Sequence, residues 1–549
     1  GKANQMIDGL ICSEDLFYFF IVIGLFLSLS VLKLHSERKV ISKSRCIVTC
    51  IGILTFVLLL EYVCTRPACM WYCDVTQDKS RTLSKGSQEV MKALDGGLTI
   101  TTYVNLLDDH RWQGLPANRV YDVRGFRQFT RFKPEIQMRY VYYYDQTDNP
   151  ILDKLYPNLS MEERARELAR VEDLDFDKFL SPEEIREKID LTSEGNRFVR
   201  LLERENGRKT FLRIYNDGQA NPGEREIIAA LKRLTIVPPK VGFLTGHDER
   251  SIRQVGEWDY SAFAANIGFR YSLVNIGFDV EEVDLRDTIP GDIHVLVIAD
   301  LKKPLTDDEQ EYLQRYVDKG GNLFILATAT RQELLNPVTR SLGVYFEPGI
   351  LVQNHKQHQQ DLILGEITSE AIHFSPEFFS NKASGKCITM PRAVAINCNG
   401  QSDFRITPIL ETSAKGCWNE QETIDFVNQV ATLGPGEQEK SYPLMVMLDR
   451  EVGSKKQHIL VVGCADCISN GELTRTRNDV NSNNYSLIME SFRVLGDRVF
   501  PVDVSRPAPV DNAIKIGETG LIVLKWFALF ILPLGIVMGG VWVWRRRRK

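Results

Sequence analysis

Residues 293–326, IHVLVIADLKKPLTDDEQEYLQRYVDKGGNLFIL, decide the fold class of the middle of this chain. Two largely apolar runs, IHVLVIAD at 293–300 and NLFILAT at 322–328, flank a segment with helical periodicity. Continuous apolar runs of this length are typical of strands that are buried on both faces. Thr306 and Glu309 form a capping box where the helical segment begins, and two glycines end it. A strand, a helix and a strand in this order predict a parallel sheet with crossover helices.

The segments on either side extend this pattern. KVGFLTG at 240–246 and DVEEVDL at 279–285 predict two more strands, and residues 258–277 between them predict one helix. Residues 236–345 are therefore expected to form a doubly wound sheet of the flavodoxin or glutamine amidotransferase type. From 346 to 518 the strands follow one another more closely, which predicts a mixed α/β continuation with an antiparallel part.

A further α/β domain is expected at residues 98–235, where strand patterns again alternate with helices. Ser160 and Glu163 form a capping box at the start of one of these helices. A thioredoxin-like layout fits this order of elements, although the segment has no CxxC motif for redox chemistry. Residues 65–97, which precede the domain, are expected to form a stalk and linker.

The ends of the chain carry three apolar runs, at residues 16–32, 46–60 and 526–544. At about 1.5 Å per residue, each can cross a hydrocarbon core about 30 Å thick, the second only narrowly. We therefore expect three transmembrane helices. The corresponding membrane regions are 1–45, which contains one helix, then 46–64 and 519–544.

Basic residues predict the orientation of these helices. The link KLHSERKVISKSR at 33–45 holds five Lys or Arg residues, and the tail at 545–549 reads RRRRK. The positive-inside rule places both segments in the cytoplasm. Residues 65 to about 520 are then expected in the periplasm of a bacterium, with the protein anchored in the inner membrane and in contact with the lipid bilayer.

The composition is that of an ordinary globular protein. Charged residues make up 25% and hydrophobic residues 44% of the 549 residues, and the formal net charge is −5. Basic residues form no long interior block, so no nucleic-acid partner is expected. The sequence has no GxxxxGK[ST] motif, so ATP hydrolysis in any system that contains this chain must come from another chain.

Several segments, in the right order, resemble GldG, the auxiliary component of a gliding-motility ABC transport system. They include TGHDERS at 245–251, DYSAFAANIGFRYSLVNIGFDVEEVDL at 259–285, SNGELTRTRN at 469–478 and LKWFALFILPLGIVMGGVWVWRRRRK at 524–549. The resemblance covers about residue 50 to the end. Residues 6–39 resemble instead the last membrane helix of GldF, the ABC-2-type permease partner. The chain is thus similar to the carboxyl-terminal part of a permease–auxiliary fusion, and an artificial join is the alternative.

The resemblance implies a non-catalytic membrane-anchored subunit that needs no cofactor. Its partners would be a separate cytoplasmic ABC ATPase, the ABC-2 permease region, and a periplasmic substrate or envelope protein. Two alternatives stay open. One is an enzyme that processes an envelope glycan or peptide through His247 and Glu249, and the other is a purely structural envelope scaffold.

The candidate ligand-binding residues include the run His247, Asp248, Glu249 and Arg250. This run follows the strand KVGFLTG, at the strand end where a doubly wound sheet binds its ligands. The alternative is a solvated loop whose polar groups cap the next helix. The turn after VLVIA, where a hydrolase of this fold would carry its nucleophile, begins with Asp300 and contains no Ser or Cys, which disfavours an amidohydrolase.

Arg475 and Arg477 are the other candidates, because they could meet an anionic or glycan partner; the alternative is hydrogen bonding within the domain. Gly24 and Ser28 form a small-xxx-small pair in the first apolar run, and we expect them to pack against permease helices rather than the chain's own anchor.

Cys464 and Cys467 form a CxxC motif directly after the strand HILVVG. It indicates either a redox pair, half a metal site, or two small residues that pack at a strand end. No metal site is expected elsewhere, because the chain has no HExxH motif and no paired CxxC motifs.

Overall fold

The strand–helix–strand segment has the predicted fold in the computed structural model of the protein. Strands β9 (Ile293–Ala299) and β10 (Asn322–Leu326) pair in parallel, and helix α13 (Asp307–Asp318) connects them. The Thr306 side chain accepts a hydrogen bond from the Glu309 N–H, and the Glu309 carboxylate accepts one from the Thr306 N–H. The predicted capping box is therefore confirmed.

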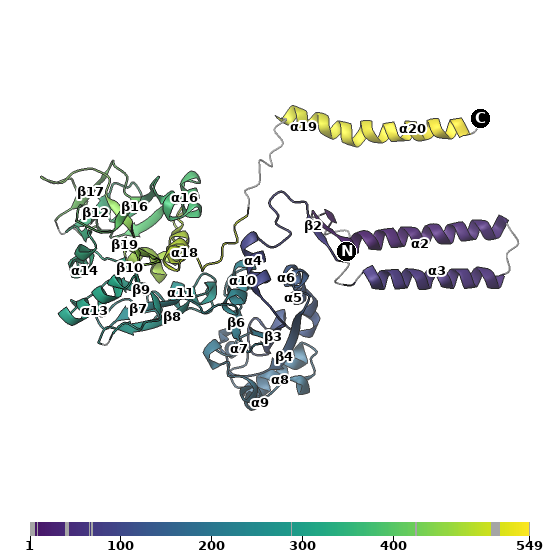
Figure 1. The fold of residues 1–549 in the computed structure, drawn as a ribbon, viewed down its shortest axis with the longest axis horizontal. Helices are drawn as coiled ribbons and strands as arrows, with labels where there is room; N and C mark the ends of the chain where they lie inside the picture. Colours follow the sequence, from purple (N-terminus) through teal and green to yellow (C-terminus); the bar gives the residue numbers. More distant parts are fainter. Residues whose placement is uncertain are drawn as a thin grey trace. The chain divides into compact units, whose positions relative to one another are not determined.

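The structure describes residues 6–7, 9–38, 43–64, 66, 70–286, 288–422, 425–506 and 517–547 (Figure 1). Parts of the basic link at 33–45 and of the basic tail at 545–549 lie outside these residues. The chain divides into two units, of which one comprises Gly1–Thr82 with Ser505–Lys549 and the other Leu83–Val504. The segment 83–97, expected to be linker, belongs to the second unit and contains helix α4 (Lys85–Ala93).

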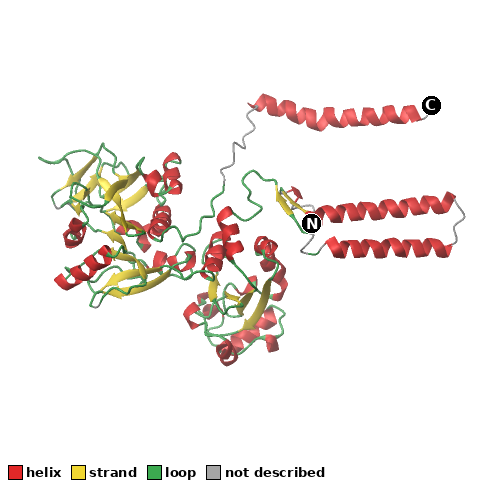
Figure 2. Cartoon of the chain, viewed as in Figure 1, coloured by secondary structure: helices red, strands yellow, loops and turns green. Residues whose placement is uncertain are grey.

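The larger unit is a mixed α/β body, as the sequence predicts, and its main element is a nine-stranded sheet (Figure 2). The strand order is β14-β13-β16-β18-β19-β10-β9-β7-β8. The parallel part contains β9 and β10 with β7 (Lys240–Thr245), β8 (Asp279–Asp284) and β19 (Lys455–Val462). The antiparallel part contains β13 (Leu362–Ile367), β14 (Ile388–Pro391), β16 (Arg405–Glu411) and β18 (Pro443–Val452). The predicted antiparallel continuation of the same sheet is thus confirmed.

Helices cover both faces of this sheet. Alternate residues of β9 point to opposite sides, so that Val295 and Val297 belong to one apolar core and Leu296 and Ile298 to the other. On the first side lie α10 (Glu224–Arg233), α11 (Ser261–Ala264), α12 (Leu273–Ile276) and α18 (Asn484–Leu495). On the second side lie α13 and α14 (Asn336–Ser341).

The single helix predicted at 258–277 is wrong, because only α11 and α12 form there. The chain between them turns to contact the amino-terminal lobe at 98–235. The Arg270 guanidinium forms ion pairs with Asp217 at 2.7 Å and Glu226 at 3.0 Å. A Cβ at Gly268 would lie 2.9 Å from the Asn216 side chain, so a continuous helix of ordinary residues could not make this approach. Tertiary contacts outweigh local helix propensity here.

The amino-terminal lobe contains a four-stranded sheet with the order β4-β3-β5-β6. Its strands are β3 (Leu98–Asn105), β4 (Ile136–Tyr143), β5 (Val199–Arg204) and β6 (Lys209–Arg213), of which only β3 and β4 are parallel. Its helices are α5 (Arg119–Gly125), α6 (Arg127–Phe132), α7 (Pro150–Leu155), α8 (Met161–Val171) and α9 (Pro182–Lys188). The Ser160–Glu163 capping box starts α8, as predicted.

Shorter elements complete the larger unit. Strand β11 (Tyr345–Phe346) pairs with β15 (Ile396–Asn397), and β12 (Ile350–Gln353) pairs with β17 (Cys417–Glu420). Three further short helices are α15 (Ala371–Phe374), α16 (Pro376–Ala383) and α17 (Asn470–Thr474).

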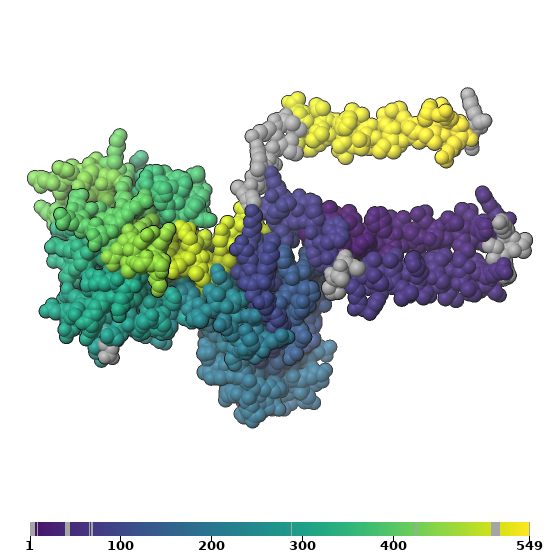
Figure 3. Space-filling model, viewed as in Figure 1, coloured from purple at the N-terminus to yellow at the C-terminus, as the bar shows by residue number. Residues whose placement is uncertain are grey.

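Among its described residues, the smaller unit has three helices that are long and apolar enough to cross a membrane. Helices α2 (Ser13–Arg38) and α3 (Lys43–Cys64) lie side by side along their length (Figure 3). The third helix runs through α19 (Gly517–Trp526), a π-helical turn at Phe527–Ile531 and α20 (Leu532–Arg547). The π-helical turn precedes Pro533, which has no N–H to donate to the turn before it. Strands β1 (Leu10–Cys12) and β2 (Tyr72–Asp74) pair next to α2 and α3.

Phe492 tests the core on the first side of the sheet. Its ring is fully buried and lies within about 6 Å, centroid to centroid, of Phe263, Phe278 and Phe324. Phe492→Ala is expected to lower the free energy of unfolding by about 3 to 5 kcal/mol because it leaves a cavity. Phe132→Ala, at an exposed position, should change it by less than about 0.5 kcal/mol. Urea unfolding of the detergent-solubilised chain, followed by circular dichroism, measures both, and equal losses would contradict this account of the core.

Candidate functional site

The carboxyl ends of β7, β9, β10 and β19 meet at one edge of the large sheet because these strands are parallel. The end of β14 reaches the same edge, where the Cys464 thiol donates to the Pro391 carbonyl at 3.0 Å. Ligands of doubly wound sheets bind at this edge. The candidate run His247–Arg250 follows β7 here, as its sequence position predicts.

Arg250 holds the loops of this edge together. Its guanidinium forms an ion pair with Asp300 at 3.0 Å and another with Asp466, and it donates to the Trp258 carbonyl at 2.7 Å. A weaker hydrogen bond reaches the Thr328 hydroxyl at 3.4 Å. Asp300, Thr328 and Asp466 follow β9, β10 and β19 respectively, so Arg250 links four strand ends. The Arg250 guanidinium therefore bonds to groups of the protein itself, and only 8% of the residue is exposed.

The structure brings His247 and Glu249 together but leaves Asp248 apart. The two imidazole nitrogens of His247 lie 3.2 Å from a Glu249 carboxylate oxygen and 3.2 Å from Glu309, which also caps α13. His247 is therefore enclosed by two carboxylates. Asp248 is exposed and forms an ion pair with Lys303 at 2.8 Å, which lowers the pKa of the Asp248 carboxyl.

Backbone strain is concentrated along this edge. Four of the ten described non-glycine residues with positive φ lie in its loops, namely Asp248 at 58°, Asp300 at 56°, Thr330 at 74° and Arg392 at 54°. Such conformations cluster at ligand and active sites, where the surrounding structure enforces them. Asp300 occupies the sharp turn after β9 where a hydrolase would carry its nucleophile. Its carboxylate is already paired with Arg250 and, at 2.7 Å, with Arg331.

A hollow of about 380 Å³ opens beside this network, between the ends of β14 and β19 and the start of α17. The residues that border it include Trp258, His358, Asp361, Arg392, Arg475 and Arg477. Asp466 borders it as well, so the Arg250 network forms part of its wall. We call this feature the arginine hollow.

Two guanidinium groups of the arginine hollow have no acidic partner within the described part of the chain. Arg477 is not one of them, because it forms a bidentate pair with Glu472 at 2.6 and 3.0 Å. Arg392 and Arg475 are exposed, and no described carboxylate lies within 4.0 Å of either side chain. Burial raises the pKa of the Asp361 carboxyl, and Arg392 offsets this only in part.

This arrangement suits recognition of an anionic group. Two free guanidinium groups can form charge-assisted hydrogen bonds to a carboxylate or phosphate, and the exposed Trp258 ring can stack on a sugar or peptide. The sequence identifies Arg475 and Arg477 of this site but misses Trp258, Asp361 and Arg392. Arg392 could have been identified from its position directly after the strand CITMP, which ends at the same sheet edge as the strand before the run His247–Arg250.

The CxxC pair contributes packing at this edge. Cys464 and Cys467 are free thiols and are buried, and the Cys467 thiol donates to the Cys464 carbonyl at 3.0 Å. Burial raises the pKa of the Cys464 thiol well above its usual value, with Cys467 adding to the effect. Buried thiols of this kind are unreactive, so the structure favours the packing interpretation.

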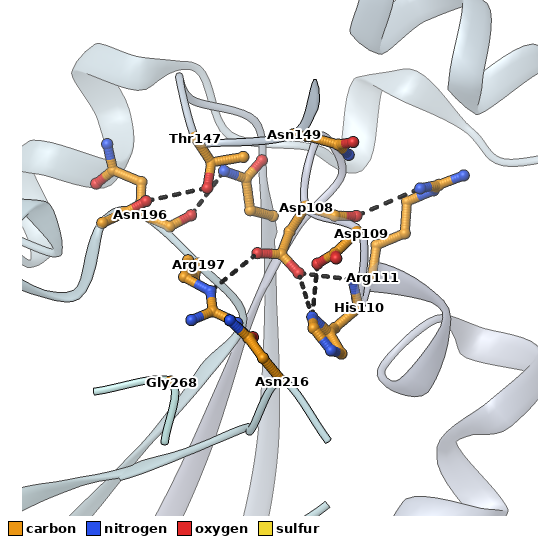
Figure 4. Close-up of polar contacts among 12 residues, drawn as sticks. Asp108, Asp109, His110, Arg111, Thr147, Asn149, Asn196, Arg197, Asn216 and Gly268 are labelled. Carbon is orange, nitrogen blue, oxygen red and sulfur yellow. Dashed lines mark hydrogen bonds and ion pairs between the residues drawn. The ribbon is translucent and has the colours of Figure 1, made fainter. Parts of the chain in front are cut away.

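A second polar cluster lies in the amino-terminal lobe, directly after β3 (Figure 4). The Nδ1 atom of His110 lies 2.6 Å from Asp109 and 3.5 Å from the buried Asp108, whose other oxygen is 3.9 Å from Arg197. Arg197 also donates to the Asn216 side chain at 2.5 Å. The sequence alone does not reveal this cluster, because its residues come together only when the loop after β3 meets the loop before β5.

One nitrogen and two carboxylate oxygens of this second cluster lie within 4.8 Å of one another, which is a possible metal-ligand set. The Asp108 carboxylate, however, raises the pKa of His110, with burial opposing and Asp109 adding to the shift. The raised pKa favours the protonated imidazole, whose positive charge lies close to both carboxylates, so the contacts are those of an ion-pair group.

Gly24 and Ser28 lie on the side of α2 that faces α3. Both residues are exposed, and a Cβ added at Gly24 would meet no atom within 4 Å. The short sequence between the two helices keeps them adjacent as an antiparallel pair. Their packing against permease helices stays a prediction.

His110→Gln tests the ion-pair group by its pH dependence. Because the folded-state pKa of His110 is raised, its contribution to stability is fully present below its unfolded pKa of about 6.5 and is lost as the pH rises through the folded value. The pKa of Asp108 is lowered, so Asp108 stays ionised in this range. We expect His110→Gln to destabilise the protein near pH 6 and to have little effect near pH 9. Denaturant midpoints measure this, with the exposed His373→Gln as control, and a pH-independent loss would contradict it.

Comparisons with known proteins bear on the region that contains the arginine hollow. Residues 238–491 match the model of a family described as an ABC-type uncharacterized transport system. Among curated proteins, no sequence matches the chain.

Three similar solved structures each have a TM-score below 0.5, which is too low to indicate a shared function. They are the mmIFT52 N-terminal domain (14% identity, 47% of this chain, 97% of that chain, TM-score 0.31), a putative ThuA-like protein from Parabacteroides merdae ATCC 43184 (10%, 45%, 95%, 0.25) and an exo-β-1,4-mannosidase from Opitutaceae bacterium strain TAV5 (10%, 71%, 51%, 0.27). The family match, which runs from just before β7 into α18, supports an accessory role for this chain in an ABC-type transport system.

Proposed function

We propose that this protein is a non-catalytic, membrane-anchored auxiliary subunit of an ABC-2-type transport system, of the GldG type, and that its large unit binds an anionic envelope ligand in the arginine hollow. A separate cytoplasmic ATPase would supply ATP hydrolysis, and a permease would supply the transport path. The large unit would lie in the periplasm, with the three apolar helices in the inner membrane.

The observation that carries the ligand-binding part is the pair of unpartnered guanidinium groups at Arg392 and Arg475. They border a hollow at the sheet edge where ligands bind in this architecture. Arg392 also has a positive φ, a strained conformation of the kind that clusters at ligand sites. Asp361 adds a carboxyl group of raised pKa on the same wall. The hollow therefore offers both donors for an anion and an acceptor for a neighbouring hydroxyl or amine, as in a muropeptide or another acidic glycan.

The non-catalytic part rests on how the polar groups of the edge are used. Asp300 stands where a nucleophile would be required, and its carboxylate is paired with Arg250 and Arg331. His247 is held between Glu249 and Glu309 rather than beside a Ser or Cys. These contacts favour a rigid wall over a proton-transfer site.

Loss of either free guanidinium is expected to weaken binding of an acidic glycan. With soluble muropeptides as the probe, Arg392→Gln and Arg475→Gln should each raise the dissociation constant about 10-fold or more, since a charge-assisted hydrogen bond contributes about 1.5 to 3 kcal/mol. Arg124→Gln, an exposed arginine of the other lobe, is the control and should leave it unchanged. Isothermal titration calorimetry measures all three. Equal binding by all variants, or none by the parent protein, would contradict the ligand proposal.

The membrane orientation has its own test. In a variant with Cys69 and Cys73 replaced by Ser, a membrane-impermeant maleimide should label Asn206→Cys, in the exposed turn between β5 and β6, in cells with a permeabilised outer membrane. Arg547→Cys should be labelled only after the inner membrane is disrupted, because the positive-inside rule places the tail in the cytoplasm. Labelling in the reverse pattern would overturn the orientation.

A further inference from the structure

A groove runs between α2 and α3, and small residues of both helices lie among the large apolar residues that line it. Its volume is about 660 Å³, and Gly24 and Ser28 of α2 face Thr49 and Gly52 of α3 across it. A Cβ added at Gly24 or Gly52 would meet no atom within 4 Å. The small residues therefore do not bring α2 and α3 into close contact with each other. They leave a space, continuous with the α2–α3 interface, into which another helix backbone can fit.

We propose that the third apolar helix of the same chain, α19–α20, fills this groove through the face that carries Gly535 and Gly539. This inference rests on the membrane placement proposed above. The sequence GIVMG at 535–539 is a GxxxG motif, which allows close approach of helix backbones in a bilayer. A Cβ at either glycine would likewise meet no atom within 4 Å.

The small residues of the three helices lie at matching depths. The ends of α3 and α19 that flank the large folded unit must lie on the same side of the membrane. Counted from that side, at about 1.5 Å per residue, Gly24, Gly52 and Gly535 lie about 12 to 14 Å below Leu16, Leu60 and Trp526. Ser28, Thr49 and Gly539 lie about 17 to 20 Å below the same three residues. Each helix thus presents two small residues, about one turn apart, at the same level.

The groove surface suits a glycine face because it has little polarity to satisfy. The Thr49 hydroxyl donates to the Arg45 carbonyl of its own helix at 2.9 Å, so it needs no partner across the groove. Ser28 adds one further hydroxyl, and most of the remaining lining residues are large and apolar, such as Phe20 and Phe56. Helix association in a bilayer depends on close packing of this kind, since lipid and side chains are equally apolar.

The chain connections limit how far the third helix can lie from the groove. Strand β1 precedes α2, strand β2 follows α3, and the two pair from Leu10 opposite Asp74 to Cys12 opposite Tyr72. A few residues further on, the Arg506 guanidinium donates to the Lys79 and Thr82 carbonyls, the latter at 2.8 Å. Only residues 507–516 separate this point from Gly517, where α19 begins, and ten residues span at most about 35 Å. The covalent link gives α19–α20 a high effective concentration at this groove.

Disulfide crosslinking in the full-length, membrane-inserted chain tests the inference. With Cys46, Cys50 and Cys64 replaced by Ala and a protease site inserted near Asn206, the pair Ser28→Cys and Gly539→Cys should crosslink on mild oxidation. The crosslink should join the two proteolytic halves of a single chain. The matched control pair, Ser28→Cys and Val537→Cys, should not crosslink, because Val537 is two residues from Gly539 and lies on the opposite face of the helix.

A second substitution separates packing from chance proximity. Adding Gly535→Leu to the crosslinking pair should lower the crosslink yield about fivefold or more, whereas Val541→Leu should leave it unchanged. A crosslink between two chains, visible as a dimer before proteolysis, would show a second copy in the groove and overturn the inference. The inference would also be overturned if the pair gave no crosslink in a chain that stays in the membrane fraction after alkaline carbonate treatment. Extraction of the chain by carbonate would instead show that the membrane placement itself is wrong.

Discussion

The buried guanidinium of Arg250 is the constraint on which the carboxyl edge of the large sheet depends. Removing a charged group from water costs several kcal/mol, and this cost is offset only when every donor has a partner. The partners of Arg250 come from the loops after β9, β10 and β19, and from the Trp258 carbonyl. Each loop is therefore held in one position relative to the others. The wall of the arginine hollow, which includes Asp466 and Trp258, takes its shape from this requirement.

A second set of arginines joins the two lobes of the large unit. Arg270 of the sheet lobe pairs with Asp217 and Glu226, and Arg213 of the amino-terminal lobe donates to Asn275 at 3.0 Å. The chain also enters and leaves this unit at one place, because a Cβ at Gly86 would lie 2.3 Å from the Asp503 carbonyl oxygen. A unit held together in this way can move as one body when the attached helices move. That is a suitable property for an accessory subunit of a transport system.

Much of the fold can be predicted from the sequence because burial leaves a periodic record. The sequence correctly indicates the largely apolar strands β9 and β10 and the capping boxes at Thr306 and Ser160. It also indicates the three apolar helices where they are found. The helix at 258–277 could not be predicted correctly. Its apolar pattern is helical, but Gly268 and Arg270 are used for contacts with a lobe whose position the local sequence does not specify.

The sequence by itself determined the α/β class, the apolar anchors, the absence of a nucleophile after VLVIA and the candidate arginines Arg475 and Arg477. Only the tertiary structure decided which of the polar residues remain available for a ligand. Arg250 and Arg477 have the same side chain as Arg392 and Arg475, yet the first two are paired with carboxylates that follow other strands or lie on a neighbouring turn. Pairing depends on which strand ends meet at a sheet edge. That is a property of strand order in space and not of spacing along the chain.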